Sequence, residues 1–183
     1  MKNPKLFLVV LGGRPKGVNV EQHDVIFAVG DSIKDVTEVA KKHWKILVHI
    51  DSYVAIEEVD GYKVKITQDK NLQPEEMKLF FVNLGGYKPN DLEEYHKKLV
   101  LPARSEDEAK ALARKDSFFA EGIKKGNAVT HIDDKFGVIG FDVDDVLIVN
   151  EQIDPKYKII LTADSTAKFS NNKIVPGYRP LPR

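Results

Sequence analysis

The chain has 183 residues, 42% of them hydrophobic, and its 28 basic and 28 acidic side chains give a formal net charge of zero. This length suits one domain or two small ones, and the balanced charge excludes a whole-molecule attraction to nucleic acid or to an anionic membrane. The absence of cysteine excludes disulfides, thiolate nucleophiles and thiolate metal sites. No apolar stretch has the length of a transmembrane helix, so a soluble, cytoplasmic protein is expected.

The first half of the chain alternates strand patterns with one helix pattern. Gly12-Gly13 ends the first apolar run and predicts a tight turn, and Asp60-Gly61 predicts a hairpin turn. Ser32 with Asp35 three residues later predicts a capped helix, because apolar residues follow at helical spacing. The four segments with strand character are Leu6–Leu11, Asp24–Val29, Val48–Ile56 and Tyr62–Ile66. The predicted order of elements is therefore β-β-α-β-β.

The second half repeats these patterns after a polar linker. Ser105 with Glu108 again predicts a capped helix, with Ala109, Leu112 and Ala113 on its buried face. The segments with strand character are Leu79–Leu84, His96–Ala103, Val143–Val149 and Tyr157–Thr162. A basic, proline-rich tail from Lys173 onward is expected to be irregular.

The two halves are also related in sequence. Lys5–Asp35 aligns without a gap onto Lys78–Glu108, with ten identical residues. A repeat of this size dictates architecture before any other signal. The expected fold is α+β, with two tandem β-β-α-β-β repeats related by a pseudo-two-fold axis and sharing or docking their cores. The expected boundaries are residues 1–66 for the first repeat, 67–77 for the linker, 78–153 for the second repeat, and 154–183 for a C-terminal strand and irregular tail.

Four of the five histidines lie in repeated segments, each close to a carboxylate. Glu21 and His23 return as Glu94 and His96, and His49-Ile50-Asp51 returns as His131-Ile132-Asp133. Residues two apart on a strand face the same side, so each pair would present a carboxylate beside an imidazole. Such a pair either pins a turn to a strand by a hydrogen bond or serves as a metal ligand or acid/base group. Duplication favours the first interpretation. The catalytic or ligand candidates are His23, His49, Asp51, His96, His131 and Asp133.

The glycine pair after the first strand is a candidate anion site. Backbone amides of Gly12 and Gly13, with Arg14 and Lys16 beside them, could bind a phosphate or a carboxylate. The segment matches neither the P-loop nor the dinucleotide-binding pattern. The alternative is a turn in which the glycines serve only the backbone angles.

The acidic stretch from Asp142 to Asp145 is the remaining candidate for a divalent cation. Carboxylates suit hard cations, but the stretch lacks the spacing and glycine of an EF-hand. A solvated strand start is the simpler interpretation. No metal and no cofactor is assigned from the sequence, and the motifs of serine hydrolases and zinc proteases are absent.

The segments LGGRPKG (Leu11–Gly17), EQHD (Glu21–Asp24) and LGGY (Leu84–Tyr87) resemble markers of a bacterial family. That family is catalogued as domain of unknown function 1543, and the resemblance covers residues 5 to 153. It implies one or two copies of the repeat in each member. It implies no activity, since the family has none to transfer.

These patterns favour a non-catalytic binding or interaction module that uses the Gly-Gly loops and the cleft between repeats. Its partner would be a small-molecule anion or a protein, with neither membrane nor nucleic acid expected. The alternative is a metal-assisted or acid/base enzyme built on the repeated Glu, His and Asp residues. Whether His23 and His49 converge within one repeat discriminates between the two functions.

Overall fold

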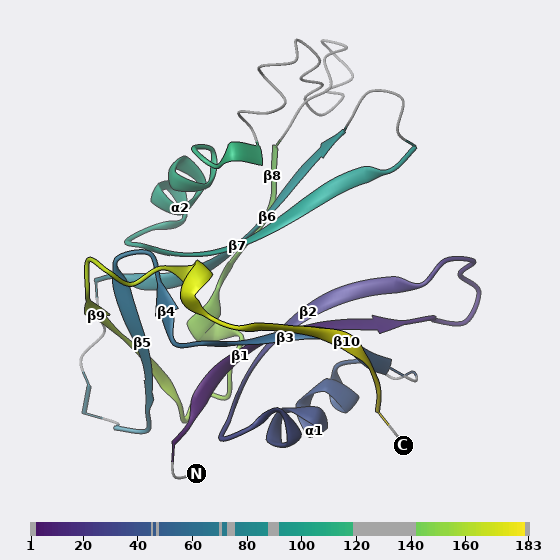
Figure 1. Cartoon of the computed structure of the whole chain (residues 1–183), viewed down its shortest axis with the longest axis horizontal. Helices are drawn as coiled ribbons and strands as arrows, with labels where there is room; N and C mark the ends of the chain where they lie inside the picture. Colours follow the sequence, from purple (N-terminus) through teal and green to yellow (C-terminus); the bar gives the residue numbers. More distant parts are fainter. Residues whose placement is uncertain are drawn as a thin grey trace. The chain divides into compact units, whose positions relative to one another are not determined.

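The computed structural model describes residues 3–44, 46, 48–69, 71–72, 76–87, 92–118 and 142–181. The fold is α+β, with two α-helices and antiparallel sheets among these residues (Figure 1). The chain divides into two compact units, Met1–Glu75 with Val149–Arg183 and Glu76–Ile148. No helix of the described ranges is long and apolar enough to cross a membrane.

The first unit is built on a four-stranded antiparallel sheet. Its strands are β1 (Lys5–Gly13), β2 (Gln22–Gly30), β3 (Val48–Ile56) and β10 (Ile174–Pro180), in the order β10-β3-β1-β2. Helix α1 (Ile33–His43) packs on one face of the sheet (Figure 1). Phe7, Val9 and Leu11 of β1 point into this core because they alternate along the strand.

The sequence signals at α1 and α2 are confirmed at the caps and partly along the helix faces. The Ser32 amide donates a hydrogen bond of 2.8 Å to the Asp35 carboxylate, as the capping-box pattern predicts. Val36 and Ala40 are fully buried, whereas Val39 is 43% exposed. The apolar stripe of α1 is therefore narrower than the sequence indicates.

A small sheet extends the first unit. It contains β4 (Glu58–Val59), β5 (Tyr62–Thr67) and β9 (Lys158–Ala163) in the order β4-β5-β9. Gly61 has a φ of 83° in the turn between β4 and β5, which confirms the turn predicted from Asp60-Gly61. Two short 3-10 helices, Val149–Glu151 and Phe169–Asn171, flank β9 along the chain.

The second unit contains a three-stranded sheet and α2 (Glu106–Ala113). The strands β6 (Lys78–Tyr87), β7 (Glu94–Ala103) and β8 (Asp142–Ile148) lie in the order β7-β6-β8. The Glu108 amide donates to the Ser105 hydroxyl at 3.2 Å, so the predicted cap is present. Ala109 and Ala113 are buried, but Leu112 is 38% exposed because α2 meets the sheet with small residues.

The expectation of an irregular C-terminal tail is wrong. Residues 174–180 form β10, which pairs with β3 at the edge of the sheet. Proline is tolerated on an edge strand because one side of the backbone needs no ladder hydrogen bond, and Pro176 and Pro180 occupy such positions. The Leu181 amide then donates to the Val48 carbonyl at 3.2 Å, and the Leu181 side chain enters the core beneath α1.

The first strand of each unit is buried on both faces, as its continuous apolar run predicts. Leu6, Phe7, Leu8, Leu79 and Phe81 are at most 8% exposed. Val10 differs from the prediction, since it is only half-buried.

We expect Val9→Ala to lower the free energy of unfolding by about 2–3 kcal/mol, because it removes buried methyl groups and leaves a cavity. Val20→Ala is the matched control, since Val20 is 63% exposed and its replacement should change stability by less than about 0.5 kcal/mol. Urea unfolding of both variants measures the difference. Equal midpoints would contradict the burial described for β1.

Candidate functional site

One end of β1 places two histidines on either side of a glycine. Leu11 faces the core under α1, so Gly12 faces the opposite side of the sheet. In the strand register, Gly12 pairs with His23 on β2 and with His49 on β3. The two imidazoles therefore rise from the two strands that flank Gly12, although they are distant in sequence.

A β-bulge brings a carboxylate to the same place. Val10 pairs with Ser52 and Leu11 pairs with Ile50, so Asp51 is the extra residue of β3. A bulge re-aims a side chain locally. The Asp51 carboxylate lies 3.2 Å from His23 Nε2 and 3.1 Å from His49 Nε2.

Glu21, the residue before β2, supplies a second carboxylate. Its Oε1 atom lies 3.4 Å from His23 Nε2 and 3.3 Å from His49 Nε2. Each carboxylate thus approaches both imidazoles, and Glu21, His23 and Asp51 each offer one ligand atom within 4.8 Å of the others. We call Glu21, His23, His49 and Asp51 the first cluster. His43 is not part of it, because it pairs with Asp24 at 2.7 Å.

The polar atoms of the first cluster are close together without forming hydrogen bonds. His49 is only 6% exposed, and its Nε2 atom has no hydrogen-bond partner, as is also true of Asp51 Oδ2. The distances are short enough, so it is the angles that fail. Buried polar groups normally find a partner, and exceptions call for an explanation such as a bound ion. Atoms aimed at a common point rather than at one another have the geometry of ligands.

His49 and His23 differ in their surroundings. The Tyr178 ring of β10 lies against the His49 ring, with centroids 4.3 Å apart, and Pro180 pairs with His49 in the sheet. The His49 orientation is therefore fixed by packing. His23 has a side chain that is 51% exposed, so the first cluster opens to solvent on the β2 side.

Gly12 is required by close approach and not by backbone angle. A Cβ atom at Gly12 would overlap His49 Nε2 and lie 2.8 Å from Asp51 Oδ2. The positive-φ glycines of the described ranges are Gly17, Gly61 and Gly177. The expectation that Gly12 and Gly13 form a tight turn and serve its backbone angles is therefore wrong, because both belong to β1.

The candidate anion site has a different setting from the one predicted. Gly12 and Gly13 belong to β1, which is paired on both sides, so the loop starts only at Arg14. Arg14 and Lys16 are exposed there, and Gly17 has a φ of 90°. The Gly-Gly pair is thus part of the sheet and not of the loop. Anion binding by these residues stays a prediction.

The second unit repeats the construction of the first cluster. Gly85 pairs with His96 on β7, and the β6–β8 register leaves Asp144 as the extra residue of a bulge. His96 Nε2 lies 3.6 Å from Glu94 Oε2 and 3.4 Å from Asp144 Oδ2. A Cβ atom at Gly85 would overlap the Asp144 carboxylate. We call Glu94, His96 and Asp144 the second cluster.

In the second unit, the strand register places different residues where the first unit has His49-Ile50-Asp51. The strand partner of Gly12 is His49, whereas the strand partner of Gly85 is Asp142. Asp142-Val143-Asp144 therefore occupies the place of His49-Ile50-Asp51. His131 and Asp133 lie outside the described residues. The sequence signal for Asp144 is an aspartate that follows a polar and an apolar residue at the start of an apolar run. This pattern also fits a solvated strand start, so it does not single out Asp144.

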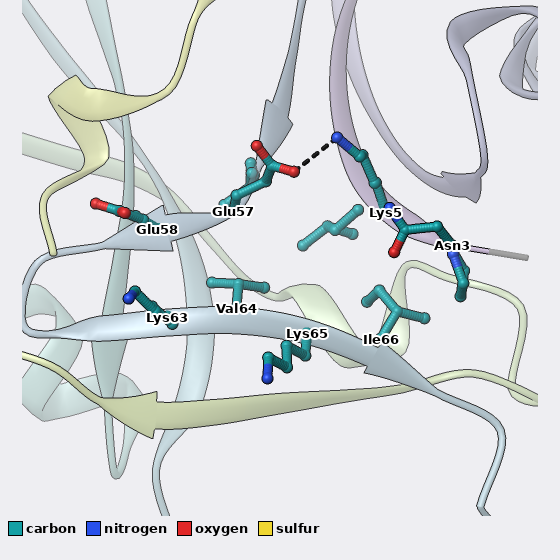
Figure 2. Close-up of a pocket in the computed structure, with 11 residues that line it drawn as sticks. Asn3, Lys5, Glu57, Glu58, Lys63, Val64, Lys65 and Ile66 are labelled. Carbon is teal, nitrogen blue, oxygen red and sulfur yellow. Dashed lines mark ion pairs between the residues drawn. The ribbon is translucent and has the colours of Figure 1, made fainter.

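A separate cavity of about 360 Å³ lies between the start of β1, the end of β3 with β4, and β5 (Figure 2). It is at the opposite end of β1 from the first cluster. Lys5 at its edge pairs with Glu57 at 2.7 Å, and Lys63 pairs with Asp164 at 2.9 Å. Hydrogen bonds from Thr166 and Lys63 hold the pKa of Asp164 well below its usual range. Two of the three lysines that line the cavity are therefore paired, and Glu57 and Glu58 line it as well, so the cavity is a weak candidate for an anion site.

Comparisons with known proteins agree with this description. Residues 18–66 match the family model described as Domain of Unknown Function (DUF1543), which confirms the predicted family over that segment. The segment contains all four residues of the first cluster. A crystal structure of the protein Il1583 from Idiomarina loihiensis is similar to this chain, with 29% identity, coverage of 99% of this chain and 100% of that chain, and a TM-score of 0.68. No curated protein matches the sequence.

We expect Gly12→Ala to lower the free energy of unfolding by about 1–3 kcal/mol, because its methyl group would overlap the His49 ring in a packed site. His49→Ala removes that ring, so the double variant should be more stable than the sum of the two single changes predicts. Urea unfolding of all four proteins measures the coupling. Strict additivity would show that Gly12 and His49 do not meet.

Proposed function

We propose that the protein binds a divalent transition-metal ion through Glu21, His23, His49 and Asp51. The observation that carries the proposal is the convergence of two imidazole nitrogens and two carboxylates, with the buried His49 Nε2 lacking a hydrogen-bond partner. Without a ligand, this buried nitrogen stays unpaired, which lowers the stability of the fold by about 1–3 kcal/mol. A cation at the common point would satisfy all four groups together.

The donor set indicates the class of ion. Neutral imidazole suits zinc, iron, nickel and copper, and carboxylate is an accepted ligand of zinc and iron. With no cysteine in the chain, the ions that require thiolate ligands are not favoured. A site with two nitrogens and two carboxylates therefore fits zinc, ferrous iron or cobalt.

This proposal makes the protein a binding module of a specific kind, and all its ligands come from the first unit. It needs no cleft between the repeats. We include in the proposal that the two units arose by duplication. The support is that β2-β1-β3 and β7-β6-β8 have the same pairing and a bulge at corresponding positions.

A metal-assisted enzyme is the second candidate function, and the openness of the first cluster favours it. The side chains of His23 and Glu21 are 51% and 38% exposed, so water or a substrate can reach the ligand atoms. A bound metal with an open position can acidify water or polarise a carbonyl. A carboxylate that exchanges off the metal could then serve as the general base.

We expect the purified protein to bind Zn²⁺ or Co²⁺ after removal of adventitious metal with a chelator. His23→Gln and His49→Gln should each weaken this binding by at least about 100-fold, because loss of a direct ligand exceeds the typical effect of an outer partner. His43→Gln is the matched control, since His43 pairs with Asp24 outside the first cluster. Isothermal titration calorimetry gives the affinities.

Unchanged affinity in both cluster variants would contradict the proposal, as would equal loss in His43→Gln. Circular dichroism of each variant without metal separates loss of ligands from loss of fold. The metal should also raise the melting temperature of the parent, by the linkage between binding and stability, and raise that of His49→Gln by a smaller amount.

The openness of the first cluster has its own test. If the ion keeps a position accessible to solvent, sodium azide should shift the visible absorption bands of the Co²⁺-loaded protein. Glu21→Gln should reduce the Co²⁺ affinity without closing that position. Absorption bands that stay unchanged at all azide concentrations would indicate a coordinatively closed site. That result would favour the binding module over the enzyme.

A further inference from the structure

We infer that the second cluster is a cation site of a different class, and that the residue at the position of His49 sets the difference. In the second unit that residue is Asp142. The inference rests on the proposed function, because it assigns a metal class to each copy of the same construction. The first site would take a borderline transition metal such as Zn²⁺ tightly, and the second a harder ion such as Mn²⁺ more weakly.

The second cluster has the marks of a cation site independently of the first. Glu94 Oε1 is buried without a hydrogen-bond partner. Glu94, His96 and Asp144 each bring one ligand atom within 4.8 Å of the others. The backbone at Gly85 leaves the space into which the Asp144 carboxylate fits. An acidic surface patch without function would need no such cleared space.

Asp142 does not replace His49 as a ligand. Its carboxylate accepts a hydrogen bond of 2.7 Å from the Val143 amide and lies 3.8 Å from the Arg114 guanidinium. Its side chain is 49% exposed, in contrast to the buried His49. Among the described strands, β8 is the edge of its sheet, whereas β3 is covered by β10 and its Tyr178 ring. The second cluster therefore offers one imidazole and two carboxylates.

This donor set changes both selectivity and affinity. Oxygen ligands suit Mg²⁺, Ca²⁺ and Mn²⁺, whereas each added imidazole favours zinc and its neighbours. Three protein ligands hold an ion less firmly than four, and the remaining positions go to water. The side chain of His96 is also 39% exposed, so water competes with His96 for the ion.

The test first removes metal binding at the first cluster and then gives the second cluster a histidine at the position of His49. In a His23→Gln/His49→Gln background, calorimetry with Zn²⁺ and with Mn²⁺ should show weak binding with a small preference between the ions. Adding Asp142→His should raise Zn²⁺ affinity by about tenfold or more, comparable to the effect of a supporting ligand, with little change for Mn²⁺. Glu106→His is the matched control, because it adds a histidine on α2, where Glu106 pairs with Lys110.

The reciprocal variant keeps the test decisive if Asp142→His fails to fold. His49→Asp in the otherwise unchanged chain should lower Zn²⁺ affinity at the first site and bring it close to the Mn²⁺ affinity. The inference is overturned if the isolated second site binds Zn²⁺ as tightly as the first, or if a folded Asp142→His gains nothing over Glu106→His. The proposed function survives that outcome, and fails only if His49 and His23 prove irrelevant to binding.

Discussion

The first cluster depends on the absence of a side chain at the end of a central strand. Gly12 lies between two neighbours in the sheet, and its missing Cβ leaves the volume that His49 and Asp51 occupy. In a regular sheet adjacent strands lie about 5 Å apart, so side chains of the two outer strands stand about 10 Å apart on one face, with a side chain of the central strand between them. With glycine in that place, side chains from the two outer strands reach across the backbone and meet.

The rest of the arrangement follows from the antiparallel order. Because β1 lies between β2 and β3, the start of β2 and the start of β3 come to the same end of β1. Asp51 lies two residues after His49 and so faces the same side of β3, and the bulge leaves it without a partner on β1. His49 Nε2 and Asp51 Oδ2 are buried without a hydrogen-bond partner, which costs stability. The proposed cation would satisfy both atoms.

Much of the fold could be predicted from the sequence, because strand patterns and helix caps are local signals. The apolar run at Leu6–Leu11 and the Ser32–Asp35 cap each specify their own backbone. The role of Gly12 could not be predicted, because the clash depends on side chains from two other strands. The equivalence of Asp142 with His49 could not be predicted for a related reason: it is set by strand pairing, whereas the visible sequence match to His49-Ile50-Asp51 is His131-Ile132-Asp133.

The C-terminal strand connects these features. Tyr178 packs against His49, and the Leu181 side chain seals the core beneath α1, so residues after the second unit complete the first sheet. An exposed edge strand invites unwanted pairing, and prolines such as Pro176 and Pro180 on β10 reduce it. Here β10 also fixes the ring of the most buried ligand candidate, and β8, which lacks such cover among the described strands, carries a solvated aspartate instead. The difference between the two clusters is therefore a consequence of which sheet receives the end of the chain, since a buried imidazole needs a covered strand and an exposed carboxylate does not.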